Sequence, residues 1–347
     1  MKPINTALCS FGMSGQVFHA PFVDVNPNFS LYGVLERTKN LAQEKYPDVK
    51  TYRTLEELLS DEAVELVVVN TPNSTHYEYT RQIIEAKKHV VVEKPFTASF
   101  KEAEALISLA EKHGVKLSVY QNRRWDSDFK TVKKIIDEDS LGNIVEVEMH
   151  YDRFAPELSY KIHKEIPAPG VGILYDLGSH IIDQALHLFG MPLSVFASVN
   201  TFRETSKVTD YFDVKLYYPS HYATLKSSYF VLEPLPAYIV HGTNGSFIKS
   251  KADIQEAELQ KEVKPDTANW GVEPESEMGL LHILENGKSK KELIPTERGN
   301  YMAFYDGVFE AIRNDKPVPV SATEAAQVIK IIEVALESNK TKRVIDL

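Results

Sequence analysis

The sequence has 347 residues, of which 43% are hydrophobic and 25% charged, and its formal net charge is −10. This length predicts two domains, and the acidic balance argues against both a nucleic-acid partner and attraction to an anionic membrane surface. The single cysteine, Cys9, excludes an internal disulfide and a cysteine-based zinc site, and it fits a reducing compartment. Because no signal-peptide pattern and no membrane-length apolar run is present, we expect a cytoplasmic protein.

Residues 1–122 alternate between short apolar runs of strand length and stretches with helical spacing. The strand-like runs are "NTALCSF", "SLYGVLE", "VELVVVN", "HVVVE" and "VKLSVYQ". They are rich in Val and Leu and lack polar alternation, which is typical of strands buried on both faces. Ser99 and Gly114 have the places of an N-cap and a C′ residue around one intervening helix. The pattern predicts an α/β domain with a helix-covered parallel sheet.

After Asn122 the pattern changes to runs that alternate between polar and apolar residues. These runs are "NIVEVEMHYDRF", "SVFASVNTF", "YFDVKLYY", "YATLKSSYFVL", "AYIVHG" and "SFIKS". "GTNG" between the last two predicts a hairpin turn. Helical spacing appears in "SDFKTVKKIIDED", "YMAFYDGVFEAIRND" and "TEAAQVIKIIEVALESN". We expect a second, α+β domain over residues 123–347 with a mostly antiparallel sheet, whose C-terminal helix could pack back on the first domain.

The first strand-like run leads into the glycine-containing loop "SFGMSGQVFHAPF". A dinucleotide-binding loop has the spacing G-x-G-x-x-G, so that backbone amides can approach a pyrophosphate at a helix N-terminus. Here Ser10 has the first position, followed by Gly12 and Gly15. The match is incomplete, and a plain strand–turn–helix is the alternative. Its place after the first strand and before the first helix favours a dinucleotide site.

The run "SLYGVLE" ends about twenty residues beyond the glycine loop, at Glu36. An acid at this place can hold the ribose hydroxyls of NAD, whereas the adjacent Arg37 could accept the 2′-phosphate of NADP. The alternative is that both are solvated charges in a strand-to-helix loop. The sequence therefore leaves the choice between NAD and NADP open.

Polar residues follow three of the predicted parallel strands, in "TPNSTH", "EKP" and "QNRRW". Ligands of an open parallel sheet bind beyond the carboxyl ends of its strands, so these residues mark the predicted site. Lys94 ends the apolar run "VVVEK", where its ammonium could donate a hydrogen bond to a substrate oxygen or take its proton. A salt bridge from Lys94 to a neighbouring helix, or to Glu93, is the alternative.

The predicted second domain contains "GILYDLGSHIIDQALHLFG", where Asp176 and His180 stand four residues apart. They would share a helical face, and a carboxylate one turn before a His can orient its ring and make it more basic. This arrangement suits a general acid/base, although a surface His paired with Asp176 would look the same. Asp183 and His187 permit a metal reading with His180. No familiar metal-site spacing is present, so we expect no metal.

These motifs resemble the Gfo/Idh/MocA family of oxidoreductases. The likeness rests on "FGMSG", "TPNSTH", "EKP" and "YDLGSHIIDQALHLFG", and "FHAPF" and "NRRWDSDF" look closest to its NADP-dependent scyllo-inositol dehydrogenase branch. It covers nearly the whole chain. Two departures matter: Ser10 replaces the first glycine, and Glu36 stands where NADP-preferring members often have a small or uncharged residue.

The resemblance implies a Rossmann domain followed by a domain with an open, mostly antiparallel sheet, and hydride transfer at nicotinamide C4. It implies that Lys94, Asp176 and His180 are catalytic. The residues that we expect to contact the dinucleotide are Phe11, Gly12, Met13, Ser14, Gly15, Glu36, Arg37, Thr71, Pro72, Asn73, His76, Glu93, Lys94, Asn122 and Arg123. The residues that we expect to face the substrate are Lys94, Arg124, Trp125, Arg153, Tyr160, Asp176 and His180.

The expected reaction is reversible oxidation of a secondary alcohol in a cyclic polyol or sugar, with NAD or NADP as cofactor. A dinucleotide-binding sensor without catalysis is the main alternative, but such a protein would be expected to lack the Lys or the His. A non-sugar substrate such as a diol is the other alternative. Family members commonly pair through the second-domain sheet, so we expect a homodimer or homotetramer.

Overall fold

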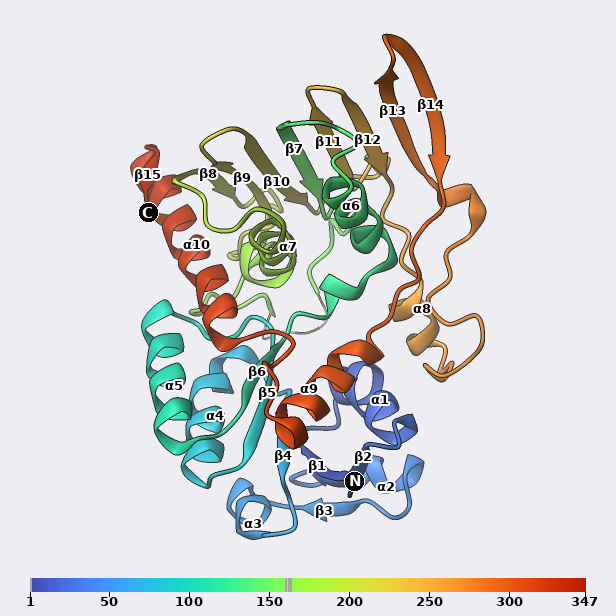
Figure 1. The fold of residues 1–347 in the computed structure, drawn as a ribbon. Coiled ribbons are helices and arrows are strands. Elements are labelled where there is room, and N and C mark those ends of the chain that lie inside the picture. The colour runs from blue at the N-terminus through green and yellow to red at the C-terminus, as the bar shows by residue number, and fades with distance from the viewer. Residues whose placement is uncertain (1, 160, 162–163) are drawn as a thin grey trace. The chain divides into compact units, whose positions relative to one another are not determined.

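The computed structural model describes residues 2–159, 161 and 164–347 (Figure 1). The chain divides into two compact units. The first unit contains residues 1–122, 254–270 and 300–326, and the second contains 123–253, 271–299 and 327–347. The first division thus falls after residue 122, where the sequence pattern changes. Two later segments, predicted to belong to the second domain, pack instead with the first unit.

The described part of the first unit forms a six-stranded parallel sheet in the order β3–β2–β1–β4–β5–β6. Its strands are β1 (Ile4–Leu8), β2 (Phe29–Leu35), β3 (Lys50–Tyr52), β4 (Leu66–Val69), β5 (His89–Glu93) and β6 (Leu117–Tyr120). This is the order of a Rossmann fold, and the strand sequence reverses between β1 and β4. The predicted parallel sheet is confirmed. The three-residue strand β3 was not predicted, because it is too short to show a pattern.

Helices of the first unit lie on both faces of this sheet. They are α1 (Ala20–Val25), α2 (Leu41–Lys45), α3 (Leu55–Ser60), α4 (His76–Glu85), α5 (Phe100–His113), α8 (Gln255–Gln260) and α9 (Met302–Asn314). In Figure 1, α4 and α5 lie side by side on one face, and α1 and α9 on the other. The predicted ends of α5 are confirmed: Ser99 forms a capping box with Glu102, and Gly114 has a φ of 64°.

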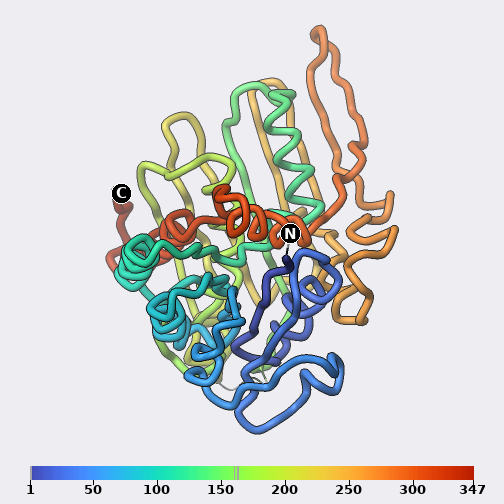
Figure 2. Tube along the Cα trace, turned by 60° about the horizontal axis from the view of Figure 1, so that its bottom comes forward, coloured from blue at the N-terminus to red at the C-terminus, as the bar shows by residue number. Residues whose placement is uncertain are grey.

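The later segment 300–326 packs against the start of the chain within the first unit. Figure 2 shows the N-terminal end beside red segments of this region. Arg313 of α9 donates hydrogen bonds of 3.4 Å to the carbonyl oxygens of Lys2 and Pro3. At the β6 edge of the sheet, the Ser118 hydroxyl donates to the carbonyl of Val320 at 2.8 Å. These contacts explain why the segment belongs to the Rossmann unit although it is far away in sequence.

In the described residues of the second unit, nine strands form one mixed sheet in the order β14–β13–β12–β11–β7–β10–β9–β8–β15. Neighbouring strands are antiparallel except for β7 and β10, which are parallel. The strands are β7 (Ile144–His150), β8 (Ser194–Asn200), β9 (Tyr211–Tyr217), β10 (Tyr222–Ser228), β11 (Tyr238–Gly242), β12 (Gly245–Lys249), β13 (Gly279–Glu285), β14 (Lys288–Ile294) and β15 (Ile345–Asp346). The "GTNG" hairpin is confirmed between β11 and β12. The β13–β14 hairpin, which was not predicted, extends from the sheet edge (Figures 1 and 2).

The remaining α-helices of the described residues are α6 (Ser127–Asp137), α7 (Ser179–Phe189) and α10 (Ala322–Thr341). One face of the second-unit sheet is buried, as the alternation in β9 shows: Phe212, Val214 and Leu216 are inaccessible to solvent. The residues between them are partly exposed. No helix among the described residues is both long and apolar enough to cross a membrane.

Candidate active site

The Rossmann unit joins the ends of β1 and β4 at the point where the strand order reverses. The Ser10 amide donates to Asn70 Oδ1 at 2.9 Å, and the Ser10 hydroxyl donates to the Asn70 carbonyl at 2.9 Å. In return, Asn70 Nδ2 donates to the Ser10 carbonyl at 2.9 Å. Ser10, which stands in place of the first glycine, therefore connects the end of β1 to the end of β4 by hydrogen bonds. Ligands of open α/β sheets bind at this switch point.

The two remaining glycines of the loop have different reasons to be glycine. A Cβ on Gly15 would lie 2.5 Å from the Ser10 carbonyl oxygen and 2.9 Å from Asn70 Nδ2, so close packing excludes a side chain there. A Cβ on Gly12 would meet no atom within 4 Å, and the residue is exposed. Its backbone is therefore open to an approaching ligand. Beside it, Met13 is 48% exposed and Phe11 is buried. This loop, which opens the first helix, fits the pyrophosphate of a dinucleotide.

Glu93 connects the loop to the predicted catalytic lysine. Its Oε1 accepts hydrogen bonds from the Ser14 hydroxyl and from His19 Nε2, and its Oε2 accepts from the Lys94 amide at 3.0 Å. Lys94 follows β5 directly and is partly buried, and the Lys94–Pro95 peptide bond is cis. Glu93 thus bonds the main chain of Lys94.

The turn after β4 is held by a buried histidine. One ring nitrogen of His76 lies 2.9 Å from the Pro95 carbonyl and the other lies 2.9 Å from the Thr71 carbonyl. Burial lowers the pKa of His76. Pro72 is exposed and Asn73 is partly exposed. His76 therefore links this turn to the Lys94–Pro95 turn through its two ring nitrogens. A direct contact between His76 and a dinucleotide stays a prediction.

The acid after β2 is engaged within the protein. Glu36 is 7% exposed, and its two carboxylate oxygens accept hydrogen bonds from the amides of Leu41 and Ala42 at 3.1 and 3.0 Å. It therefore satisfies the N-terminus of α2, where a carboxylate is favourable. Arg37 is exposed. Arg53 bonds the carbonyls of Glu36 and Lys39 at 2.7 Å and so braces this loop.

In the second unit, Asp176 and His180 do not share one regular α-helix. Asp176 lies in a π-helical turn, Leu174–Gly178, and His180 is the second residue of α7. The Asp176 carboxylate lies 2.8 Å from the ammonium of Lys164. His180 is 5% exposed, and its ring centroid lies 6.0 Å from that of Tyr151. Lys164 and Tyr151 are the neighbours that sequence reasoning missed.

Tyr151 follows β7 and lies among basic side chains. The guanidinium carbon of Arg153 is 5.6 Å from its ring centroid, and the ammonium of Lys251 is 4.7 Å from it. Arg153 is exposed, as a substrate-facing residue would be. The polar alternation of "EVEMHYDRF" could have pointed to this strand end, but nothing local pointed to Lys251. Tyr160, also predicted to face the substrate, lies outside the described residues.

Arg124, which is also predicted to face the substrate, forms a buried ion pair with Asp183. Its Nε and Nη2 donate to the two carboxylate oxygens of Asp183 at 2.8 and 2.7 Å, and both side chains are at most 6% exposed. Asp183 is thereby engaged, and no group of metal-ligating side chains is found among the described residues. Arg123 and Asn122 are buried as well, whereas Trp125 is partly exposed. A guanidinium Nη1 of Arg123 lies 3.5 Å from Asp126.

The geometry of this pair predicts a structural role for Arg124. Arg124→Met should lower the free energy of unfolding by about 3–5 kcal/mol, because the buried Asp183 carboxylate would lose its bidentate, positively charged partner. Urea unfolding measures this change. The matched Arg124→Met/Asp183→Leu double variant should be less destabilised than the single one. If Arg124→Met had the same free energy of unfolding as the unmodified protein, the structural role would be contradicted and the substrate-facing role favoured.

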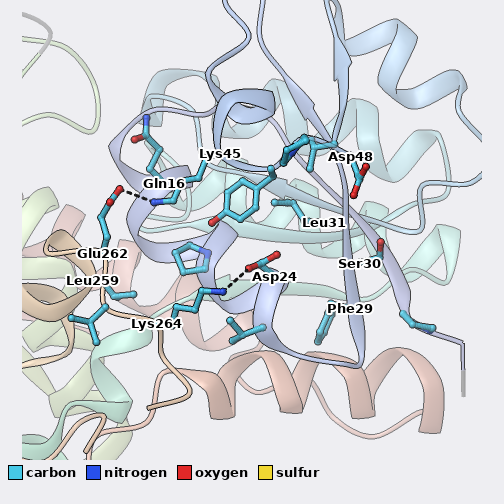
Figure 3. Close-up of a pocket in the computed structure, with 17 residues that line it drawn as sticks. Gln16, Asp24, Phe29, Ser30, Leu31, Lys45, Asp48, Leu259, Glu262 and Lys264 are labelled. Atoms are coloured by element: carbon cyan, nitrogen blue, oxygen red, sulfur yellow. Dashed lines mark hydrogen bonds and ion pairs between the residues drawn. The ribbon is translucent and has the colours of Figure 1, made fainter.

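A large surface hollow of about 700 Å³ lies elsewhere on the first unit (Figure 3). It is bounded by α1, the α2–β3 connection and the segment after α8. Ion pairs join Lys45 to Glu262 at 2.8 Å and Lys264 to Asp24 at 3.9 Å at its wall. Gln16, which directly follows Gly15, lines this hollow, whereas Gly12, Gly15 and Lys94 do not.

Family models match both the N-terminal and the C-terminal part of the chain. Residues 4–121 match the family model described as "Oxidoreductase family, NAD-binding Rossmann fold", and residues 133–347 match "Oxidoreductase family, C-terminal alpha/beta domain", both of the Gfo/Idh/MocA group. The chain is 42% identical, over 99% of its length and 96% of the relative's, to scyllo-inositol 2-dehydrogenase (NADP(+)) IolW of Bacillus subtilis.

Solved structures show the same architecture. The yvaA protein of Bacillus subtilis matches with a TM-score of 0.96 and 42% identity, covering 99% of this chain and 98% of that one. An oxidoreductase from Bacillus cereus matches with a TM-score of 0.92 and 34% identity, covering 99% and 98%. The chain therefore belongs to the Gfo/Idh/MocA family of oxidoreductases, with an NAD-binding Rossmann domain and a C-terminal α/β domain.

Proposed function

We propose that the protein is a nicotinamide-dependent dehydrogenase of a secondary alcohol in a cyclic polyol, with an inositol as the substrate class. The family membership supports an enzyme, and the full-length relative that is named for scyllo-inositol supports the substrate class. The observation that carries the proposal is the placement of Lys94. It follows β5 of the Rossmann sheet, and its backbone is bonded to the same carboxylate as Ser14 of the glycine loop. A lysine so anchored suits chemistry at a bound nicotinamide.

Three side chains divide the proposed chemistry. A bound nicotinamide would supply the acceptor for the carbinol hydrogen, which leaves the carbon as hydride. His180 accepts the hydroxyl proton of the alcohol, and Asp176 orients its ring. Lys94 donates a hydrogen bond to the same oxygen and stabilises the negative charge that develops there. In the reverse direction His180 returns the proton to the oxygen.

The direct test is the absorbance of the reduced nicotinamide, followed with a panel of inositols, aldoses and small diols. We expect turnover with at least one inositol and weaker turnover with diols. A flat trace across the panel, together with tight dinucleotide binding by calorimetry, would instead support a sensor without catalysis. Turnover with diols alone would keep the enzyme and overturn the substrate class.

We also propose that NADP is the preferred cofactor and that Arg37 contacts its 2′-phosphate. Both oxygens of Glu36 accept amide hydrogen bonds of α2, whereas the neighbouring Arg37 and Lys39 are exposed. The full-length relative is named as NADP-dependent. A guanidinium is well suited to a phosphate.

The NADP proposal predicts a selective defect. Arg37→Ala should raise the dissociation constant of NADP by about tenfold, because one charge-assisted contact is lost, and should leave that of NAD nearly unchanged. Calorimetry with each dinucleotide measures both values, and NAD serves as the internal control. An equal loss for both dinucleotides, or tighter binding of NAD by the unmodified protein, would contradict the assignment.

We propose that the open face of the second-unit sheet pairs with a second copy of the chain. Phe196 of β8 and Tyr222 of β10 are 37% and 46% exposed on this face, and Tyr217 of β9 contacts Tyr222 with ring centroids 5.3 Å apart. Exposed aromatic clusters of this kind mark interfaces.

The expected result for the double variant Phe196→Glu/Tyr222→Glu is a monomer in light scattering after size exclusion, because two carboxylates would have to be desolvated at the interface. The unmodified chain should be a dimer or tetramer. Lys101→Glu, an exposed change on α5, is the control and should keep the native mass. A monomeric native protein, or an assembled double variant, would refute the proposed interface.

A further inference from the structure

Four side chains form a continuous hydrogen-bonded chain inside the Rossmann unit. Tyr305 Oη lies 2.7 Å from His19 Nδ1, and His19 Nε2 lies 3.0 Å from Glu93 Oε1. The Ser14 hydroxyl donates to the same Glu93 oxygen, and the Lys94 amide donates to Glu93 Oε2. His19 and Tyr305 are inaccessible to solvent, and the Glu93 side chain is 13% exposed.

The protons of this chain can be assigned from its chemistry. Burial acts to raise the pKa of Glu93, but its hydrogen bond with His19 and its contacts with Ser14 and Lys94 lower it to about 2. The carboxylate is therefore ionised and can only accept, so His19 Nε2 carries a proton. Burial and the nearby Glu93 charge raise the pKa of Tyr305, which keeps its phenol protonated. Its hydroxyl can donate to Nδ1.

Aromatic packing fixes the imidazole in place. The ring centroid of His19 lies 4.6 Å from that of Tyr120, at the end of β6. Tyr305 packs on Phe22 and Phe29 with centroid distances of 6.1 and 5.6 Å. A buried polar ring in such a cluster is costly unless both nitrogens are hydrogen-bonded, as they are here. An apolar residue could fill the same space, so packing alone does not require a histidine.

The two groups held by Glu93 belong to different parts of the candidate active site. Ser14 lies in the dinucleotide loop, directly before the tightly packed Gly15, and Lys94 is the proposed catalytic lysine. One carboxylate therefore fixes both the loop and the main chain of the lysine. Its orientation depends on the imidazole behind it.

We propose that His19 is a positioning residue: through Glu93 it locks the dinucleotide loop and the backbone of Lys94 into one arrangement, with Tyr305 fixing the imidazole from behind. The inference rests on the proposed function for the role of Lys94. The new element is that one buried residue, His19, affects both dinucleotide affinity and turnover. It does so indirectly, through its hydrogen bond with Glu93.

The test compares two isosteres of His19. The amide nitrogen of a glutamine reaches the place of Nε2 and can donate to Glu93, whereas that of an asparagine reaches only the place of Nδ1. His19→Asn should raise the dissociation constant of the dinucleotide about tenfold and lower kcat about tenfold, and His19→Gln should restore most of both. Binding is measured by calorimetry without substrate, and folding by thermal unfolding.

Tyr305→Phe keeps the ring and removes the hydroxyl, so it should change both quantities in the same direction but less. Tyr52→Phe is the matched control: its hydroxyl donates to Asp61 Oδ2 at 2.9 Å, away from Glu93, and its loss should change neither quantity. If His19→Asn fails to fold, Tyr305→Phe decides. Native affinity and kcat in His19→Asn or, failing that, in Tyr305→Phe would overturn the proposal, as would equal defects in His19→Asn and His19→Gln.

The outcome can be separated from a failure of the proposed function. If Lys94 is not catalytic, Lys94→Met will retain turnover, but dinucleotide binding by the His19 variants will still report on the loop. If Lys94→Met is inactive and the His19 variants bind normally, the catalytic assignment stands and the positioning role falls.

Discussion

Lys94→Met is expected to lower kcat by about 10²–10⁴-fold on the true substrate while leaving the dinucleotide dissociation constant little changed. Methionine keeps the length of the side chain and removes the ammonium, so the loss is that of a donor to the developing alkoxide. The main chain at residue 94 should be unaffected, because the hydrogen bond to Glu93 Oε2 comes from the backbone amide of residue 94, which methionine keeps. Steady-state kinetics and calorimetry measure the two quantities.

The control for Lys94 is another lysine of the same unit. Lys101→Met, at an exposed position of α5, should have native kcat and native dinucleotide affinity. Near-native turnover of Lys94→Met would remove the lysine from the mechanism. Loss of dinucleotide binding together with kcat would show that Lys94 serves the cofactor rather than the substrate oxygen.

His180→Asn is expected to lower kcat for alcohol oxidation by about 10²–10⁴-fold and to change the shape of its pH profile. In the unmodified enzyme, kcat should fall at low pH as the base becomes protonated. The variant has no such base, so the plateau that kcat reaches above this decline should disappear. Its residual rate should instead rise with pH, because solvent must take the hydroxyl proton.

The measurement is kcat against pH with saturating dinucleotide, with His187→Asn as the matched control. His187 lies on the same helix α7 but is exposed, so its replacement should leave rate and profile native. A His180→Asn profile that retains the native shape, a low-pH decline followed by a plateau, would assign the proton to another group. Lys94 would then be the first candidate, since a pair acting on one oxygen can titrate jointly.

Asp176 has a further partner that bears on this experiment. Its carboxylate pairs with Lys164 at 2.8 Å, a contact between two partly exposed groups that salt will weaken. Elsewhere in the second unit, Tyr151 lies beside His180, and the basic groups of Arg153 and Lys251 lie over its ring. We propose that Tyr151 and Lys251 join the predicted substrate-facing residues.

Local signals in the sequence determined much of the fold. Continuous Val and Leu runs specified the buried parallel strands, since both faces of such a strand must be apolar. The capping box at Ser99 and the left-handed Gly114 specified the ends of α5. Period-two alternation specified β7 to β12 of the second sheet, and "GTNG" its central hairpin. The family motifs carried the candidate catalytic residues.

Other parts of the fold have signals too weak to be seen locally. Strand β3 has three residues, and its pattern cannot be told from a loop. Every residue of β14 except the last is exposed, so its sequence shows no buried face. Residues 300–326 join the Rossmann unit through contacts with its start and its edge strand. Residues 254–270 join it through the Lys45–Glu262 ion pair and the packing of Trp270 on Phe22. Nothing in the composition of either segment specifies that destination.

The sequence by itself determined which residues can do chemistry, because side-chain type and spacing are local properties. Only the tertiary structure decided what each of them meets. It placed Arg124 on Asp183, Glu36 on the amides of α2, and His19 between Glu93 and Tyr305, which is 286 positions away. The physical reason is that a buried polar group must find a hydrogen-bond partner in three dimensions, and that partner is chosen by the packing of distant elements rather than by neighbours in the chain.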